Sequence, residues 1–275
     1  MAADKREKGE INYIMFDYHM HTTVSFDGKS TAVEMVQAAK AAGLKEICFT
    51  DHMDYCRSSH FPNMLFDLDE YNRAYDGLEM PGLLIRNGVE FGLTTWNRPD
   101  LDAFLKRRHF DFVLGSVHFA QDIDPYEERY WEGRSVKEAF RVYLEEMLEC
   151  VKIHDNFDVL GHLTYACKSP HNPTREPILF EDFHEITDEV MRVLITKGKG
   201  MEINSSGVDS VGVFLPSEDY LRRFKELGGE IVTMGSDAHN TVRVGQYADR
   251  AMAILKDIFG YVCTFEDRKP IFHKL

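Results

Sequence analysis

The sequence predicts an α/β fold in which parallel strands close into a single barrel. Strand-like apolar runs alternate with helix-like segments about seven times along the 275 residues, an alternation that is typical of a parallel sheet. A chain of this length also suits one α/β barrel. No GxGxxG or P-loop motif follows the first expected strand, so an open, doubly wound sheet is the less favoured alternative.

The expected strands and helices follow one another along the whole chain. Strands are expected at 13–21, 46–52, 83–92, 111–119, 158–163, 200–206 and 230–239. Helices are expected at 31–42, 66–79, 135–153, 181–197, 217–227 and 245–258. Two of these helices begin with capping-box spacing, Thr31 with Glu34 and Ser135 with Glu138. No repeat or low-complexity linker interrupts the pattern, so we expect one domain over 13–275 after a short frayed tail at 1–12.

The composition indicates a globular protein with an acidic surface. Acidic residues outnumber basic ones by 46 to 32, and the formal net charge of -14 disfavours a nucleic-acid partner. The apolar runs are too short to cross a membrane, and the charged N-terminus does not resemble a secretory signal. The five cysteines are scattered without CxxC spacing, which favours reduced thiols and a cytoplasmic location. No feature indicates the oligomeric state.

Polar side chains recur where the expected strands end. In the first strand, "HMH" at 19–21 places His19 and His21 on one face, because side chains alternate along a strand. Five other strands end in possible metal ligands: Asp51 and His52, Glu90, His118, His162, and Asp237 with His239. One histidine in an apolar strand is usually a core residue, but six matching strand ends are hard to explain by chance. Barrel active sites lie at the carboxyl ends of the strands, so we expect these side chains to meet there.

The types of donor group indicate the kind of metal. Imidazole mixed with carboxylate, without thiolate, suits zinc, manganese or iron. The ligands are too many for one ion, so at least two ions are expected. Two ions held about 3.5–4 Å apart can stabilise both the attacking and the leaving oxygen of a displacement at phosphorus. The remaining histidines lie outside the pattern and are interpreted as ordinary surface or partly buried residues: His60, His109, His154, His171, His184 and His273.

The motifs occur in an order that matches a known family. With "HMH", "TDH", "GVEFG", "GSVH", "LGHL" and "GSDAH" in succession, the chain resembles the PHP (polymerase and histidinol phosphatase) superfamily, and within it the monofunctional histidinol-phosphate phosphatases. The resemblance extends from His19 to the closing "RKPIFHKL". It implies a distorted (β/α)7 barrel with a trinuclear metal site at the carboxyl ends of the strands, in agreement with the seven expected strands.

The resemblance also implies which side chains hold the metals. Three divalent ions are implied. The first would be held by His19, His21, Glu90 and Asp237, and the second by Glu90 again with His118 and His162. The third would be held by Asp27, His52 and His239. Asp27 looks like a turn residue in "FDG", so its assignment depends on the resemblance alone. Asp51 adjoins His52 but points to the opposite face of the strand, which favours a role in orienting a ligand over direct coordination.

The implied activity is that of a metal-dependent phosphomonoesterase. The substrate would be L-histidinol phosphate, an intermediate of histidine biosynthesis, and Asp237 or His239 would pass a proton to the leaving oxygen. One alternative is a phosphoesterase of the same family that acts on another small phosphate ester or a nucleotide. A second alternative is a non-catalytic, metal-stabilised module, which should lack ligands. Every ligand position is filled here, so this alternative is weak.

Substrate recognition is where the chain departs from its relatives. They usually carry one arginine shortly after the fifth-strand histidine and another after an "NTSG"-like motif; here these places hold Lys168 and Asp209. Another cation could reach the phosphate, with Lys168, Arg175 and Arg243 the candidates, or the substrate could carry a positive group that meets Asp209. The polar residues of "EINSS", Asn204, Ser205 and Ser206, are expected either to bind substrate or to cap the sixth strand.

Overall fold

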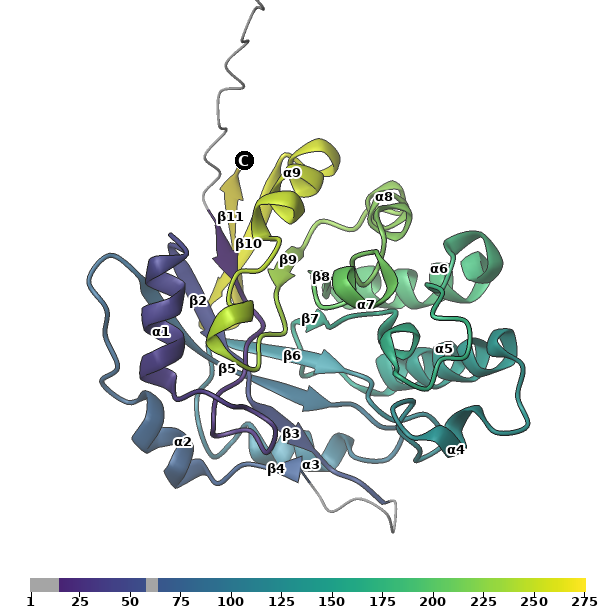
Figure 1. Ribbon diagram of the computed structural model, residues 1–275, viewed down its shortest axis with the longest axis horizontal. Coiled ribbons are helices and arrows are strands. Elements are labelled where there is room, and N and C mark those ends of the chain that lie inside the picture. The colour runs from purple at the N-terminus through teal and green to yellow at the C-terminus, as the bar shows by residue number, and fades with distance from the viewer. Residues whose placement is uncertain (1–14, 58–63) are drawn as a thin grey trace, which may run out of the picture.

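Parallel strands follow one another around a barrel in the computed structural model, which describes residues 15–57 and 64–275 (Figure 1). The seven barrel strands of this part of the chain lie in the order β1 (Phe16–Asp17), β2 (Glu46–Phe49), β5 (Leu84–Gly92), β6 (Phe112–Ser116), β7 (Val159–Leu160), β8 (Gly200–Asn204) and β9 (Val232–Gly235). Each pairs in parallel with the next. Hydrogen bonds from Tyr18 N to Met234 O (2.8 Å) and from His21 N to Ala238 O (2.8 Å) bring the last strand against the first. The predicted barrel is confirmed.

The barrel strands are shorter than the sequence predicts. Within its described part, from residue 15 on, the strand expected at 13–21 shortens to β1, and the one expected at 158–163 shortens to β7. In both cases the histidines lie beyond the hydrogen-bonded ladder, where the chain turns into the mouth of the barrel. The residues expected as a frayed tail, 1–12, and His60 lie outside the described residues.

All six expected helices are present and surround the barrel (Figure 1). They are α1 (Ala32–Ala41), α2 (Leu68–Tyr75), α5 (Val136–Ile153), α6 (Phe180–Thr196), α8 (Glu218–Glu226) and α9 (Ala248–Ile258). Both capping boxes are confirmed: Thr31 and Ser135 each accept from the backbone of the glutamate three residues later, whose side chain accepts in return. No helix among the described residues is long and apolar enough to cross a membrane.

Short elements in the connecting loops were not expected. They are β3 (His52–Asp54), β4 (Met64–Leu65), α3 (Arg98–Phe104), α4 (Glu128–Trp131), η1 (Tyr165–Lys168), α7 (Val208–Val211) and η2 (Thr241–Arg243). Elements of two to seven residues are too short to give a clear hydrophobic period. Of these, α3 connects β5 to β6 and buries Leu101 and Phe104 in the core.

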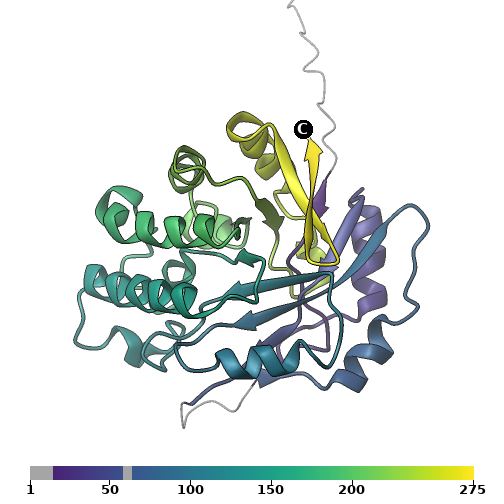
Figure 2. The ribbon, with the colours of Figure 1, turned by 180° about the vertical axis from the view of Figure 1, so that it is seen from behind.

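A C-terminal hairpin, β10 (Tyr261–Glu266) and β11 (Lys269–Lys274), covers the opposite end of the barrel (Figure 2, yellow). The buried hydroxyl of Tyr18 donates to Glu46 Oε1 at 2.5 Å and accepts from Phe265 N at 2.9 Å. Arg268 N donates to Asp111 O (2.9 Å), beside the start of β6. This end is therefore closed by the chain itself, which leaves the carboxyl ends of the strands as the open mouth.

Candidate metal centre and active site

The carboxylate of Glu90 lies at the centre of the barrel mouth and is fully buried. Its Oε2 is 3.0 Å from His52 Nδ1 and 3.3 Å from His19 Nε2. Its Oε1 is 3.1 Å from His162 Nε2 and 3.3 Å from His118 Nε2. The parallel register places His52 directly beside Glu90. His21 Nε2 also approaches Glu90 Oε2, at 3.5 Å. One carboxylate thus lies within 3.5 Å of five imidazoles from four parts of the barrel mouth, which is the geometry a bridging ligand needs.

His19 and His21 point into the same space, as their spacing predicts. Both also approach Asp237 Oδ1, at 3.6 Å from His19 Nε2 and 3.3 Å from His21 Nε2. Asp237 has a left-handed backbone (φ 56°), unusual for a residue other than glycine and found most often at functional sites. Its N–H donates to His19 O at 2.8 Å, which ties the loop after β9 to the end of β1.

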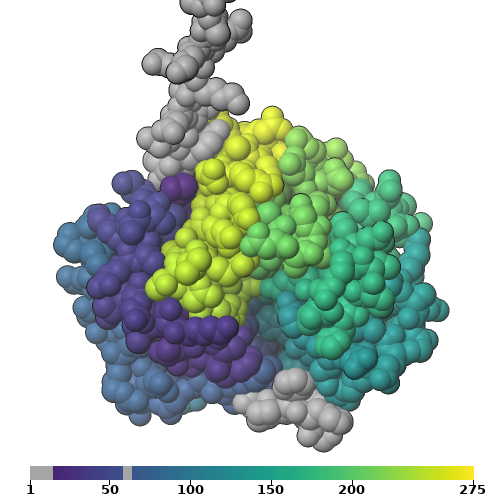
Figure 3. Space-filling model, viewed as in Figure 1, coloured from purple at the N-terminus to yellow at the C-terminus, as the bar shows by residue number. Residues whose placement is uncertain are grey.

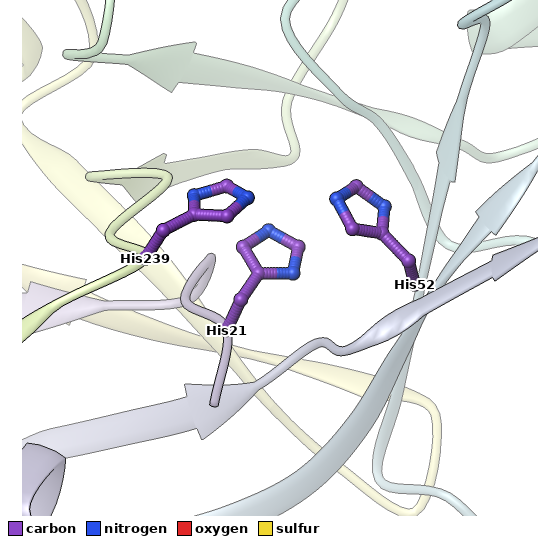
Figure 4. A group of neighbouring side chains, drawn as sticks. All are labelled: His21, His52 and His239. Carbon is purple, nitrogen blue, oxygen red and sulfur yellow. The ribbon is translucent and has the colours of Figure 1, made fainter. Parts of the chain in front are cut away.

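His239 joins His21 and His52 in a second group of three imidazoles beside Glu90 (Figure 4). The ring of His21 lies between those of His52 and His239, with centroid distances of 4.2 Å to each. Asp27 Oδ2 is 3.0 Å from His239 Nε2 and 3.7 Å from His52 Nε2. Asp27, which looks like a turn residue in the sequence, therefore lies beside the two histidines expected to share a metal with it.

The arrangement passes a test for cation binding that depends only on hydrogen bonding. Buried polar atoms in proteins are nearly always paired. Here a set of buried donors and acceptors that face one another has no hydrogen-bond partner: His19 Nε2, His21 Nε2, Asp27 Oδ1, His52 Nδ1, Asp54 Oδ2 and Glu90 Oε2. Several groups of three residues, such as His19, His21 and Glu90, place nitrogen and oxygen atoms within 4.8 Å of one another. Such groups fit divalent cations, and the donor types are those zinc, manganese and iron accept.

The electrostatics of the cluster lead to the same conclusion. Burial opposes ionisation of Glu90, but His19, His118 and His52 hold its pKa well below the usual range. Burial, followed by the neighbouring His239 and His52, lowers the pKa of His21 well below its ordinary value. Burial alone would also lower the pKa of His118, yet Asp54 and Glu90 raise it to about 10. Burial would likewise lower the pKa of His19 and of His52, yet Glu90 raises both well above the ordinary value. The buried carboxylates therefore attract positive charge, which bound cations would supply.

Two carboxylates that the sequence reading missed support the histidines. Glu202, in β8, lies 2.7 Å from His19 Nδ1 and accepts from His162 N at 2.7 Å. Asp54 lies 2.8 Å from His118 Nδ1 and 3.2 Å from His52 Nδ1. The sequence holds a signal for each of these carboxylates. Glu202 is an acidic residue inside the apolar run "GMEIN", and Asp54 follows His52 by two residues, which places both on the same face of a strand.

Glycine at 235 makes the Glu202 contact possible. A Cβ there would lie 2.0 Å from Glu202 Oε1 and 2.4 Å from the Cβ of His19, so no larger residue fits. Carboxylates that hold the second ring nitrogen of a ligand fix its tautomer and orientation. Glu202 therefore leaves His19 Nε2 directed at Glu90 and Asp237.

Asp51 points away from the cluster, as the alternation of its strand predicts. It accepts from Thr22 N and from Ser25 Oγ, both at 2.8 Å. Ser25 Oγ in turn accepts from His52 N at 2.9 Å. Asp51 thus fixes the loop after His21 against the strand that carries His52.

The cluster opens into a cavity of about 630 Å³, the size of a small-ligand site. The surface is hollowed where the purple loop after β1 meets the green segments that follow β7 and β8 (Figure 3). Lys168 lines this cavity; its Nζ is 2.5 Å from Asp237 Oδ2 and donates to Ser206 Oγ at 2.9 Å. Asn204 is fully buried behind Ser206, and its Oδ1 accepts from Ser206 Oγ at 2.7 Å. Of the expected substrate residues, Ser206 and Lys168 face the cavity and Asn204 supports Ser206 from behind.

Asp209, which stands where the relatives usually carry arginine, is itself paired with a cation. Arg243 Nη1 lies 3.2 Å from Asp209 Oδ2, and both side chains line the cavity. Asp209 also accepts from Tyr247 Oη at 2.5 Å and from Gln246 Nε2 at 3.2 Å. Arg175 is exposed and lies outside the cavity lining. Of the alternatives for a phosphate-binding cation, the structure therefore leaves Lys168 and Arg243.

Comparison with known proteins identifies the family. The model of the PHP domain matches residues 17–206. The chain belongs to the PHP family. Its curated relatives include the histidinol-phosphatase of Lactococcus lactis, 33% identical over 92% of this chain and 95% of the relative. A probable histidinol-phosphatase of Clostridium acetobutylicum is 29% identical over 94% of this chain and 96% of the relative.

Solved PHP structures confirm the fold. The crystal structure of the L. lactis histidinol phosphate phosphatase, in complex with zinc, L-histidinol and phosphate, has a TM-score of 0.83 at 31% identity and covers 94% of this chain and 98% of its own. A putative histidinol phosphatase from Listeria monocytogenes has a TM-score of 0.67 at 20% identity and covers 85% of this chain and 99% of its own, a likeness of fold. The resemblance read from the motifs is thereby confirmed.

Replacement of Glu202 by glutamine should weaken metal binding to this PHP domain. The amide removes the charge beside His19 Nδ1 and places an NH₂ group near either His19 or the donating His162 N. We expect a 10- to 100-fold loss of metal affinity or activity, the usual effect of such a change. Elemental analysis and turnover of the purified variant measure it. The matched control is Glu218→Gln, at an exposed position of α8, which should change neither metal content nor turnover. Wild-type metal content and turnover in Glu202→Gln would show that Glu202 has no part in orienting the ligands.

Proposed function

We propose that this PHP protein is a metal-dependent phosphomonoesterase that hydrolyses L-histidinol phosphate to L-histidinol and phosphate, with one domain spanning 13–275. The observation that carries the proposal is the set of unpaired imidazole and carboxylate atoms around Glu90, which opens directly into a cavity lined by Lys168 and Arg243. The near full-length likeness to a histidinol-phosphatase supports the choice of substrate, because that relative was crystallised with L-histidinol and phosphate.

The proposed cofactors are three divalent ions, with zinc, manganese or iron as candidates. The ligand sets are those implied by the resemblance: His19, His21, Glu90 and Asp237; Glu90, His118 and His162; and Asp27, His52 and His239. When bound, such ions neutralise phosphate charge and lower the pKa of water. The zinc in the L. lactis structure supports zinc among the three metals.

The residues of the chain itself would bind and orient the ester. Lys168 is held in place by Asp237 and Ser206, and its ammonium provides a positive charge for the phosphate. Burial alone would lower the pKa of Lys168, but Asp237 raises it above the ordinary value, so Lys168 stays charged. The proton for the leaving alkoxide would come from Asp237 or His239, both of which line the cavity.

The rival functions are less well supported. A non-catalytic module is disfavoured, because the structure brings all nine expected ligands to one barrel mouth. A phosphoesterase for a nucleotide or another small ester keeps the same site and differs only in the leaving group. The net charge of -14 favours a small substrate over a nucleic acid. The proposed location is the cytoplasm, which the scattered cysteines of the sequence, without CxxC spacing, favour.

Glu90→Gln tests the activity and the bridging role together. Glutamine removes one charge and one possible ligand oxygen from the centre of five imidazoles. Turnover of histidinol phosphate should therefore fall at least ~10³-fold, roughly 4 kcal/mol of barrier. Phosphate release from histidinol phosphate, nucleotides and other monoesters is the measurement. Glu149→Gln, on the exposed face of α5, is the control. Near-normal turnover in Glu90→Gln would exclude a bridging carboxylate, and a wild type that releases no phosphate from any monoester would exclude the activity.

Arg243→Ala tests the second cation. Asp209 engages one nitrogen of the guanidinium, and the remaining donors can reach a phosphate in the cavity. We expect KM for the phosphate ester to rise about tenfold, with a smaller change in kcat, and Arg243→Lys to restore part of the loss. Arg222→Ala, which breaks a surface pair with Asp257, is the matched control. An unchanged KM in Arg243→Ala would leave Lys168 as the cation that binds phosphate.

A further inference from the structure

The carboxylates that line the cavity differ in how their charge is compensated. Within the described part of the chain they are Asp27, Asp54, Asp124, Asp209 and Asp237. Four of them have an imidazole or a cation as partner: His239, His118, Arg243 and Lys168 respectively for Asp27, Asp54, Asp209 and Asp237. Asp124 forms no ion pair with any described residue. Its carboxylate therefore forms no ion pair with the histidines of the expected metal site, with Lys168 or with Arg243.

The contacts of Asp124 fix its position but leave half of its carboxylate available. Oδ1 accepts from Tyr126 N at 2.8 Å and from Tyr165 Oη at 3.3 Å. No described residue donates to Oδ2. Burial raises the pKa of Asp124 to about 6, so the group is an anion at neutral pH that lacks full solvation.

The loop that carries Asp124 is held rigidly. It leaves β6 and turns through two residues of left-handed backbone, Gln121 (φ 55°) and Asp122 (φ 58°). Hydrogen bonds in both directions between Ala120 and Ile123 close this turn, and Asp122 accepts from Trp96 Nε1 at 3.1 Å. The carboxylate is therefore positioned before any ligand arrives, which lowers the cost of binding.

Aromatic rings connect Asp124 to the metal cluster. Tyr126 and Tyr165 stack with centroids 5.2 Å apart. The ring of Tyr165 lies 5.0 Å from that of His162 and 5.2 Å from that of His118. A ligand that extends from the metal cluster towards Asp124 would thus pass along aromatic faces, which attract cations and planar rings.

We propose that Asp124, with Tyr126 and Tyr165, binds a cationic group on the leaving alcohol and so selects phosphate esters of alcohols that carry an ammonium or imidazolium. The inference rests on the proposed phosphatase function and assigns the half of the site that the phosphate does not fill. A carboxylate at this position repels a phosphate group and attracts a cation. The phosphate end is served by Lys168 and Arg243, in the loops after β7 and β9, whereas Asp124 follows β6. The two ends of the ester therefore meet opposite charges from different loops.

Asp124→Asn is the decisive variant, because asparagine can still accept from Tyr126 N and Tyr165 Oη but carries no charge. For histidinol phosphate we expect kcat/KM to fall at least 30-fold, which corresponds to about 2 kcal/mol. For p-nitrophenyl phosphate, whose leaving group has no positive charge, the change should stay below threefold. Inhibition by L-histidinol should weaken in parallel, and inhibition by inorganic phosphate should not change. Asp69→Asn, at an exposed position of α2 outside the cavity, is the matched control and should leave all four quantities unchanged.

Two results would overturn the inference. An equal fall for both substrates would make Asp124 a support of the loop or the metal cluster, and no fall for either would remove it from the site. Tyr126→Leu provides a second variant, since this exposed ring can be lost without unfolding the barrel. Its kcat/KM should again fall more for the cationic substrate than for p-nitrophenyl phosphate, by a smaller factor than in Asp124→Asn. An equal effect on both esters would count against the proposal.

The same experiment separates this inference from the proposed function. If the wild type cleaves other monoesters but not histidinol phosphate, the proposed substrate is wrong. The inference is then tested with ethanolamine phosphate against glycerol phosphate. A preference for the cationic ester that disappears in Asp124→Asn supports the inference, and a wild type without that preference contradicts it.

Discussion

The burial of the Glu90 carboxylate at the middle of the barrel mouth is the constraint on which the rest of the site depends. An ionised group without solvent costs several kcal/mol unless partners surround it. Five imidazoles lie within 3.5 Å of its two oxygens. Burial alone would lower the pKa of His19, His52 and His118, but Glu90 and the neighbouring carboxylates raise it. Divalent cations at this site would replace protons as the positive partners, and the imidazoles would then serve as neutral ligands.

The barrel keeps these ligands in register by tying its loops to one another. Asp17, at the end of β1, accepts from the backbone N–H groups of Ser236 and Gly245, each at 2.9 Å, and thereby fixes both ends of the loop that carries Asp237 and His239. Asp51 does the same for the loop after His21. Burial raises the pKa of Asp17 to about 6, a cost that its several hydrogen bonds partly offset. Asp17 and Asp51 thus show one reason why the mouth is rich in acidic side chains: some of them hold its loops together and do not point at the expected metal site.

The sequence predicted the barrel and most of the cluster because both depend on local patterns. Alternating strands and helices predict the architecture, and the strand-end position of His118 or His162 is visible along the chain. Asp27 could be placed only by resemblance, because a loop residue gives no periodic signal. Glu202 and Asp54 were missed, since their role appears only when β8 and β3 lie beside the histidines. The hairpin of β10 and β11 was missed for the same reason: its partners, Tyr18 and Asp111, are remote in sequence.

The charges around the cavity also depend on tertiary contacts. Asp209 reads as an obstacle to phosphate binding in the sequence, but in the structure it neutralises and positions Arg243. Asp124 attracts no notice in the sequence, yet it is the cavity carboxylate that the described residues leave without an ion pair. The structure thus distinguishes cavity carboxylates that pair with a cation or an imidazole from Asp124, which pairs with neither among the described residues.

Elemental analysis of protein purified without chelator tests the central claim most directly. If the Glu90 cluster is a trinuclear centre, the protein should carry about three divalent ions per chain, with zinc, manganese or iron dominant. Dialysis against a chelator should then remove the ions and the phosphatase activity together. Protein that hydrolyses its phosphate ester at full rate with well under one ion per chain would contradict the account.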